Sequence, residues 1–351
     1  MTEKMLFGTY TKRVSKGIYQ ADFDEQTGEM SNVEAIAEIG SPTYLNVSDA
    51  DVLYAVDKQD GQGGVAVYDY DSENAKTTLK QEVLADGASP AYVAVDENRQ
   101  LLYTANYHKG TVEVYAIAAD GKLTQTDAFQ AVGSGPRPEQ DGPHMHFANL
   151  TPDNRLVAVD LGSDKVYTFD VSEAGKLTEV AVFETEAGFG PRHIRFSQDG
   201  QKAYLLGELS SQLSELNYDA TSGTFELAQT LSTKPDDWEA HNGAAAIYVS
   251  ADNRFIYTSN RGHNSIAVFE VKANGAIDRR VQLISTEGDF PRDFALSPNE
   301  RYLIATNQNT DNATVYQRDI VTGQLTLQEK IFKYLSPYEL SLLNNRLRSS
   351  I

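Results

Sequence analysis

A recurring pattern decides the fold of this chain, and it is clearest in Ser89-Pro90-Ala91-Tyr92-Val93-Ala94-Val95, which leads through a polar turn to Leu102-Tyr103. The pattern consists of a small residue and proline, then alternating apolar positions, a polar turn, and an apolar pair that ends in tyrosine. It returns, with variations, after Ser41-Pro42, Gly142-Pro143, Gly190-Pro191, Gly243-Ala244 and Phe290-Pro291. Because an internal repeat determines a whole architecture, everything else in the sequence is interpreted from it.

The repeat has seven units of about fifty residues each. The residues at the tyrosine position are Phe7, Tyr54, Tyr103, Ala158, Tyr204, Tyr257 and Ile304. Each unit continues with an alternating strand such as Thr111-Val112-Glu113-Val114-Tyr115, a glycine turn such as Asp120-Gly121, and a fourth strand. Alternation bounded by Gly, Asn and Asp turns indicates antiparallel hairpins. The sequence therefore predicts an all-β fold, a seven-bladed β-propeller with four antiparallel strands per blade, with an extended solenoid as the alternative.

The two ends of the chain favour the closed ring. The first unit begins at Leu6-Phe7 and lacks the opening strand that every later unit has. The C-terminal segment Ser336-Pro337-Tyr338-Glu339-Leu340-Ser341-Leu342 matches that missing strand. We expect it to pair into the first blade and close the ring, which removes the open edges that a solenoid would leave. Residues 1–351 are accordingly expected to form one propeller domain.

Composition and charge narrow the function classes. The 351 residues include 30 Lys and Arg against 50 Asp and Glu, a formal charge of −20. Such a surface repels nucleic acid and anionic membranes, so neither is expected as a partner. The chain has no cysteine, which excludes disulfides, thiolate nucleophiles and cysteine metal sites. With no apolar leader at the N-terminus, a cytoplasmic location is expected.

Two repeat positions should meet at one edge of each blade, because the first strand begins where the antiparallel second strand ends. The residues just after the small-proline pair are Thr43, Ala91, His144, Arg192, Ala245 and Arg292. The residues four beyond the tyrosine position are Lys58, Tyr107, Gly162, Glu208, Arg261 and Gln308. Because they differ from blade to blade and include ionisable groups, they predict a site assembled from several blades. The alternative is a set of solvated loop ends.

Several segments along the chain resemble a known family: Gly142-Pro143-His144-Met145-His146, Gly190-Pro191-Arg192-His193-Ile194, Gly207-Glu208-Leu209, Ser259-Asn260-Arg261-Gly262-His263 and Pro291-Arg292-Asp293-Phe294. The chain resembles the lactonase family of seven-bladed propellers, which includes a bacterial 6-phosphogluconolactonase and a fungal carboxy-cis,cis-muconate cyclase. The resemblance implies hydrolysis of a small anionic sugar lactone without cofactor or metal. It places the catalytic groups at His144, Arg192, Glu208 and Arg261.

The residue types suit this chemistry. Lactone hydrolysis needs an activated water, a donor for the developing oxyanion and a clamp for the anionic group, and Arg192 and Arg261 fit the last two roles. A carboxylate beside two arginines stays ionised with a lowered pKa, which makes Glu208 a weak base. We therefore predict His144 as general base, with Glu208 as the alternative. His146 and Arg292 are expected to contact substrate, although Arg292 could instead pair with an aspartate of its loop.

Three functions remain open from the sequence. The first is a hydrolase that opens 6-phospho-D-glucono-1,5-lactone to 6-phosphogluconate in the pentose phosphate pathway. The second is a cycloisomerase acting on a muconate-type dicarboxylate, and the third is a non-catalytic propeller that binds proteins. A metal bound by His144 and His146 is not predicted, because the spacing specifies no complete ligand set. The physiological lactone, the oligomeric state and a lid role for the loop from Gly133 to Gly142 are left open.

Overall fold

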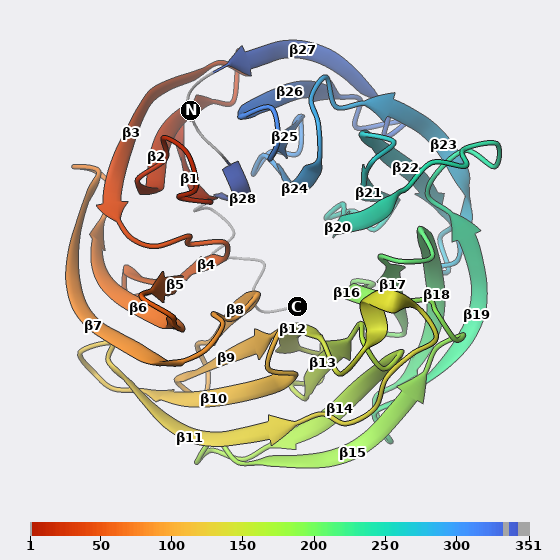
Figure 1. Ribbon diagram of the computed structural model, residues 1–351. Coiled ribbons are helices and arrows are strands. Elements are labelled where there is room, and N and C mark those ends of the chain that lie inside the picture. The colour runs from red at the N-terminus through yellow and green to blue at the C-terminus, as the bar shows by residue number, and fades with distance from the viewer. Residues whose placement is uncertain (1, 333–336, 343–351) are drawn as a thin grey trace.

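A ring of seven sheets forms the molecule (Figure 1). The computed structural model describes residues 2–332 and 337–342, and within them 28 strands make seven four-stranded antiparallel sheets. In each sheet one strand lies near the axis of the ring and one at its outer edge (Figure 1). The predicted seven-bladed propeller is therefore confirmed. No helix in this part of the chain has the length and apolar character needed to cross a bilayer.

From the innermost strand outwards, the first blade contains β28 (Pro337–Leu342), β1 (Thr2–Thr9), β2 (Gly17–Asp24) and β3 (Met30–Glu38). The second contains β4 (Leu45–Val47), β5 (Val52–Gln59), β6 (Gln62–Asp71) and β7 (Lys76–Asp86). The third contains β8 (Tyr92–Asp96), β9 (Leu101–Asn106), β10 (Thr111–Ile117) and β11 (Leu123–Gln130). The fourth contains β12 (Met145–Leu150), β13 (Leu156–Asp160), β14 (Lys165–Val171) and β15 (Leu177–Glu184).

The fifth blade contains β16 (Pro191–Phe196), β17 (Lys202–Gly207), β18 (Gln212–Asp219) and β19 (Thr224–Ser232). The sixth contains β20 (Gly243–Val249), β21 (Phe255–Arg261), β22 (Ser265–Val271) and β23 (Ile277–Ser285). The seventh contains β24 (Pro291–Leu296), β25 (Tyr302–Asn307), β26 (Asn312–Arg318) and β27 (Leu325–Phe332). A short 3-10 helix, η1 (Pro138–Gln140), lies in the loop before β12.

The ring closes as the chain ends predicted. Strand β28 pairs antiparallel with β1, so that Leu342 lies opposite Met5 and Leu340 opposite Phe7. The first blade is thus built from both ends of the chain (Figure 1). Ser336, which the sequence included in this strand, lies outside the described residues.

At three positions the repeated tyrosine joins one blade to the next. The hydroxyls of Tyr54, Tyr204 and Tyr257, all fully buried, donate to the carbonyl oxygens of glycines in the following blade. These glycines are Gly121, Gly275 and Gly323, at 3.0, 2.7 and 2.9 Å respectively. Each glycine has a positive φ in the turn between the third and fourth strands, which is why the turn needs glycine. The two most regular features of the repeat are therefore the two halves of one contact between blades.

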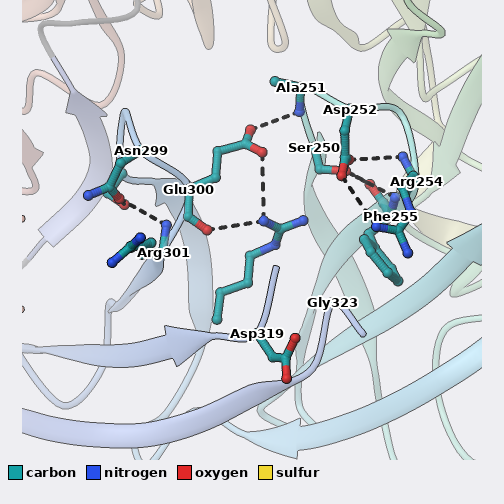
Figure 2. A network of polar contacts seen from close by, with 12 residues as sticks. Ser250, Ala251, Asp252, Arg254, Phe255, Asn299, Glu300, Arg301, Asp319 and Gly323 are labelled. Carbon is teal, nitrogen blue, oxygen red and sulfur yellow. Dashed lines mark hydrogen bonds and ion pairs between the residues drawn. The ribbon is translucent and has the colours of Figure 1, made fainter. Parts of the chain in front are cut away.

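A buried arginine completes this contact between the sixth and seventh blades. Arg318 donates to the Tyr257 hydroxyl and, at 3.1 Å, to the Glu300 carbonyl oxygen. The Glu300 carboxylate lies 3.7 Å from the Arg318 guanidinium and accepts the Ala251 backbone N–H at 2.8 Å (Figure 2). We call Tyr257, Glu300 and Arg318 the underside cluster, because they lie at the blade edge opposite the one where the predicted site residues begin their strands.

Candidate active site

The innermost strands are irregular at the point where the site residues lie. In β16 Pro191 pairs with Gly207 and His193 with Leu206, so Arg192 is an extra residue in the ladder. Arg292 is the extra residue of β24 in the same way, and His146 is that of β12. A β-bulge leaves its extra residue unpaired and re-aims its side chain, and bulges concentrate beside active sites. Three predicted site residues thus leave the ladders of three different blades.

The strand pairing corrects the repeat alignment in the fourth blade. The sequence equated His144 with Arg192 and Arg292, because each follows a proline. The His144 carbonyl oxygen instead accepts the Leu161 N–H at 3.0 Å. Leu161 lies three residues past the tyrosine position of its blade, as Gly207 does in the fifth blade, and the partner of Gly207 is Pro191. His144 therefore corresponds to Pro191. The alignment of His144 was therefore wrong by one residue, since the fourth blade has an extra residue between its proline and its strand. His146 is the residue that bulges out as Arg192 does.

Glu208 lies at the centre of the candidate site. Its Oε2 atom lies 3.0 Å from Arg192 Nε and 2.8 Å from Arg261 Nη2. Among the described residues, its Oε1 atom has no hydrogen-bond or ion-pair partner. The Glu208 N–H donates to the Gly190 carbonyl at 2.7 Å, which fixes the residue directly after β17. One carboxylate oxygen therefore holds two guanidinium groups, and the other remains for a ligand or water.

Both arginines are held by backbone oxygens as well. Arg261 donates to the carbonyls of Gly243 and Ala244, each at 3.1 Å, and lies over the Phe290 ring at 5.1 Å. Arg192 donates to the Ala245 carbonyl. Their side chains are only 5% and 3% exposed. The two guanidinium groups are thus oriented before any ligand binds.

The cluster carries more positive than negative charge. Burial, followed by the charge of Arg261, lowers the pKa of Arg192 to about 10. Burial, Arg192 and Arg261 lower the pKa of Arg292 to about 9. Burial alone would raise the pKa of Glu208, but Arg261, Arg192 and Arg292 together bring it below its ordinary value. We call Arg192, Glu208, Arg261 and Arg292 the site cluster; like charges this close need an anion to offset their repulsion.

Two buried histidines adjoin the site cluster. His146 and His193 are 3% and 5% exposed, and their ring centroids lie 5.2 Å apart. Burial, followed by the charge of Arg192, lowers the pKa of each well below its ordinary value. Both rings are therefore neutral at physiological pH. The Nδ1 atom of His146 is buried and has no hydrogen-bond partner among the described residues, so its hydrogen-bonding capacity is unsatisfied in this arrangement.

His144, the predicted base, has both ring nitrogens engaged. Its Nδ1 lies 2.9 Å from the Tyr107 carbonyl oxygen and its Nε2 lies 3.0 Å from the Asp141 carboxylate. Both partners are hydrogen-bond acceptors, so each ring nitrogen faces a protein oxygen. The ring also stacks on Tyr107 with centroids 4.3 Å apart and 7° between the planes. In this arrangement neither nitrogen is placed to take a proton from water.

The loop before His144 is anchored to the fourth blade. Gln140, in η1, is 1% exposed and donates to the Leu161 carbonyl at 2.8 Å. The Gly135 N–H donates to the Gln140 carbonyl at 3.0 Å. Asp141 at the end of the loop then reaches His144. The loop from Gly133 to Gly142 therefore forms a fixed part of the wall beside His144.

The structure brings together Arg192, Glu208, Arg261, Arg292 and His146. His144 stacks on Tyr107 and adjoins this group only through that ring. Sequence reasoning did not select Tyr107 or His193, which both lie against His146. Tyr107 could have been found, because it occupies the repeat position of Glu208 and Arg261. Within the described ranges, no three His, Asp or Glu side chains are grouped to hold a metal ion.

Known proteins similar to this chain match it along nearly its whole length. Residues 4–341 match the sequence model of the family described as "Lactonase, 7-bladed beta-propeller". A 6-phosphogluconolactonase of Bacillus subtilis is 43% identical over 324 residues, which cover 91% of this chain and 92% of that protein. A Lactobacillus plantarum protein of known structure is 53% identical, with a TM-score of 0.95 over 98% of this chain and 100% of that one. The periplasmic gluconolactonase of Pseudomonas aeruginosa is 32% identical, with a TM-score of 0.91 over 97% and 99%.

Proposed function

The chain belongs to the family of seven-bladed β-propeller lactonases, and from that premise we propose that it hydrolyses 6-phospho-D-glucono-1,5-lactone to 6-phosphogluconate. The observation that carries the proposal is the site cluster, in which two arginines contact the Glu208 carboxylate and the charge of a third, Arg292, acts on it as well. A planar guanidinium binds phosphate through two parallel hydrogen bonds, and a surplus of buried positive charge favours a substrate with a doubly charged group.

The residues have distinct roles in the proposed reaction. Arg292 binds the phosphate, because it is the arginine least coupled to Glu208: it lowers the pKa of Glu208 less than Arg261 and Arg192 do. Glu208 is ionised and orients the attacking water through Oε1. Arg192 or Arg261 donates to the carbonyl oxygen of the lactone as it gains charge; one such donor contributes about 3 kcal/mol to the transition state.

His146 is the proposed base in place of His144. It is neutral, it adjoins the arginines, and its Nδ1 is unpartnered among the described residues. As the water oxygen bonds to the lactone carbonyl carbon, a water proton passes to His146. The carbon–ring-oxygen bond then breaks, and His146 returns the proton to the departing oxygen. Acid and base are thus one residue, and the products are a hydroxyl and a carboxylic acid, which releases its proton to solvent and leaves a carboxylate.

The test compares two buried arginines. The rate of acid release from fresh 6-phosphoglucono-δ-lactone is measured above spontaneous hydrolysis for the wild type, Arg192→Met and Arg318→Met. We expect the wild type to exceed background strongly, Arg192→Met to lose about 100-fold in kcat/KM, and Arg318→Met to keep its rate. Glucono-δ-lactone, which lacks the phosphate, should be the poorer substrate. If neither lactone were opened above background, the proposal would be wrong, and a muconate-type dicarboxylate would be the next substrate to test.

A further inference from the structure

We infer that Tyr107 is a substrate-contacting residue of this site, whose hydroxyl donates a hydrogen bond to an oxygen of the lactone group. The inference rests on the proposed lactonase activity and gives a role to a residue that repeat analysis placed on the rim without assigning it one. Three features of the structure carry it: the fixed backbone of Tyr107, its clamped ring and its unpartnered hydroxyl.

The backbone of Tyr107 is fixed at the rim of the third blade. Tyr107 directly follows β9. It lies four positions past the repeated tyrosine, which is the repeat position that Glu208 and Arg261 hold in their own blades. Asn106 holds the turn, since its Nδ2 donates to the Ala88 carbonyl at 2.8 Å and its Oδ1 accepts the Lys109 N–H at 3.0 Å. Tyr107 therefore enters the site from a blade that contributes no other residue to it.

The ring of Tyr107 is clamped between histidines. His144 stacks on one face at 4.3 Å and donates from Nδ1 to the Tyr107 carbonyl oxygen. His146 meets the ring edge-on at 5.8 Å, with 80° between the planes, and His108 does so at 5.1 Å. Asp141 holds the far nitrogen of His144 in turn. A ring with contacts on its face and its edges has its hydroxyl oriented in advance, which a substrate donor requires.

The hydroxyl of Tyr107 forms no hydrogen bond with any residue that the structure describes. Six buried tyrosines of the blades differ in this respect, because the hydroxyls of Tyr54, Tyr103, Tyr115, Tyr204, Tyr257 and Tyr316 have partners. Burial, followed by the charge of Glu208, raises the pKa of Tyr107 to about 12, while Arg292 and Arg261 act in the opposite direction. The hydroxyl thus stays protonated at neutral pH, among the charges of the site cluster, where a lactone oxygen can accept from it.

This arrangement also gives His144 a role. It acts as a positioning residue for Tyr107, since its ring supports the tyrosine ring and its two nitrogens tie Tyr107 to the anchored loop.

The experiment measures kcat and KM on 6-phosphoglucono-δ-lactone for the wild type, Tyr107→Phe and the control Tyr204→Phe. Both variants lose only a hydroxyl, but that of Tyr204 binds Gly275 on the far edge of the blade. We expect Tyr107→Phe to lower kcat by about 10- to 100-fold with a smaller change in KM and an unchanged melting temperature. Tyr204→Phe should keep the wild-type kcat.

His144→Gln tests the positioning role. We expect it to lower kcat less than Tyr107→Phe does, and the double variant to be no worse than Tyr107→Phe alone, because His144 acts through the tyrosine hydroxyl. Losses that multiplied independently would overturn this role. If the wild type is active and Tyr107→Phe is equally active, the inference is wrong and the lactonase activity stands. If the wild type itself is inactive on both lactones, the proposed function and the inference fail together.

Discussion

The site cluster and the underside cluster are both built around arginine and glutamate, but they differ in charge balance. In the underside cluster one arginine, Arg318, is met by the carboxylate and carbonyl of Glu300 and by the neutral Tyr257 hydroxyl. In the site cluster two arginines share one oxygen of Glu208, and a third acts on them from nearby. The paired arginines are buried in both clusters, with Arg192 and Arg261 at 3% and 5% exposure and Arg318 at 1%, so exposure of these arginines does not explain the difference.

The comparison separates what holds the ring together from what the ring is used for. The underside cluster extends a contact between tyrosine and glycine that recurs between blades. Its charges balance, because one arginine faces one carboxylate. The site cluster takes two of its arginines, Arg192 and Arg292, from β-bulges, and its arginines lower one another's pKa. Unbalanced buried charge costs stability, and folds retain it where a ligand offsets it. Substitutions in the two clusters should therefore affect different measurements.

Glu208→Gln should have the largest effect. The change keeps the shape of the side chain but removes the carboxylate that contacts Arg192 and Arg261, so water is no longer oriented and the arginines repel one another. We expect kcat/KM on the phosphorylated lactone to fall by about 1,000-fold. Inorganic phosphate should raise the melting temperature of this variant, because an anion replaces the lost charge. Retention of a tenth or more of the wild-type activity would remove Glu208 from the mechanism.

Arg318→Met should have the largest effect on stability alone. It leaves the buried Glu300 carboxylate without its guanidinium, and breaking a buried ion pair costs about 3 kcal/mol of unfolding free energy. Urea denaturation followed by circular dichroism measures this, and kcat/KM should stay at the wild-type value. Arg192→Met is the matched variant, with the reverse pattern expected. Equal losses of activity in both would contradict the separation of the two clusters.

The buried histidines should make stability depend on pH below about 6.5, the ordinary pKa of histidine. His146 and His193 have folded-state pKa values well below this, so the unfolded chain binds protons that the folded one does not. Stability is therefore complete above pH 6.5 and falls with pH, by up to about 1.4 kcal/mol per pH unit for each histidine. Urea titrations between pH 7 and pH 5.5 should show this slope. His146→Asn should reduce the slope by the contribution of one histidine, which corresponds to the uptake of about one proton on unfolding. An unchanged slope in that variant would mean that His146 is already protonated in the fold.

Tyr204→Phe should have the smallest effect. It removes one hydrogen bond between the fifth and sixth blades and leaves the Gly275 carbonyl without this donor. The loss should be about 1 kcal/mol of unfolding free energy, measured by urea denaturation. A loss below about 0.3 kcal/mol would mean that water replaces the hydroxyl fully and that the repeated tyrosine acts through packing alone.

The sequence was sufficient for the architecture but not for the register at the site. Strand alternation and turn chemistry act over a few residues, so the blades, the glycine turns and the closing strand could all be predicted. The displacement of His144 could not be predicted. A register shift of one residue turns a side chain to the other face, and the proline before His144 suggests the unshifted alignment. The choice between His144 and His146 depended on that single residue.

Taken alone, the sequence determined the seven blades, the closure of the ring through β28 and the set of charged groups that meet at one edge. These follow from local periodicity and from an antiparallel connection that must return each strand to its starting edge. Tertiary structure alone decided which groups touch: that Glu208 holds two arginines on one oxygen, that both ring nitrogens of His144 have partners in Tyr107 and Asp141, and that Nδ1 of His146 has none among the described residues. Those contacts join residues from different blades, and their distances depend on bulges and packing that no local pattern encodes.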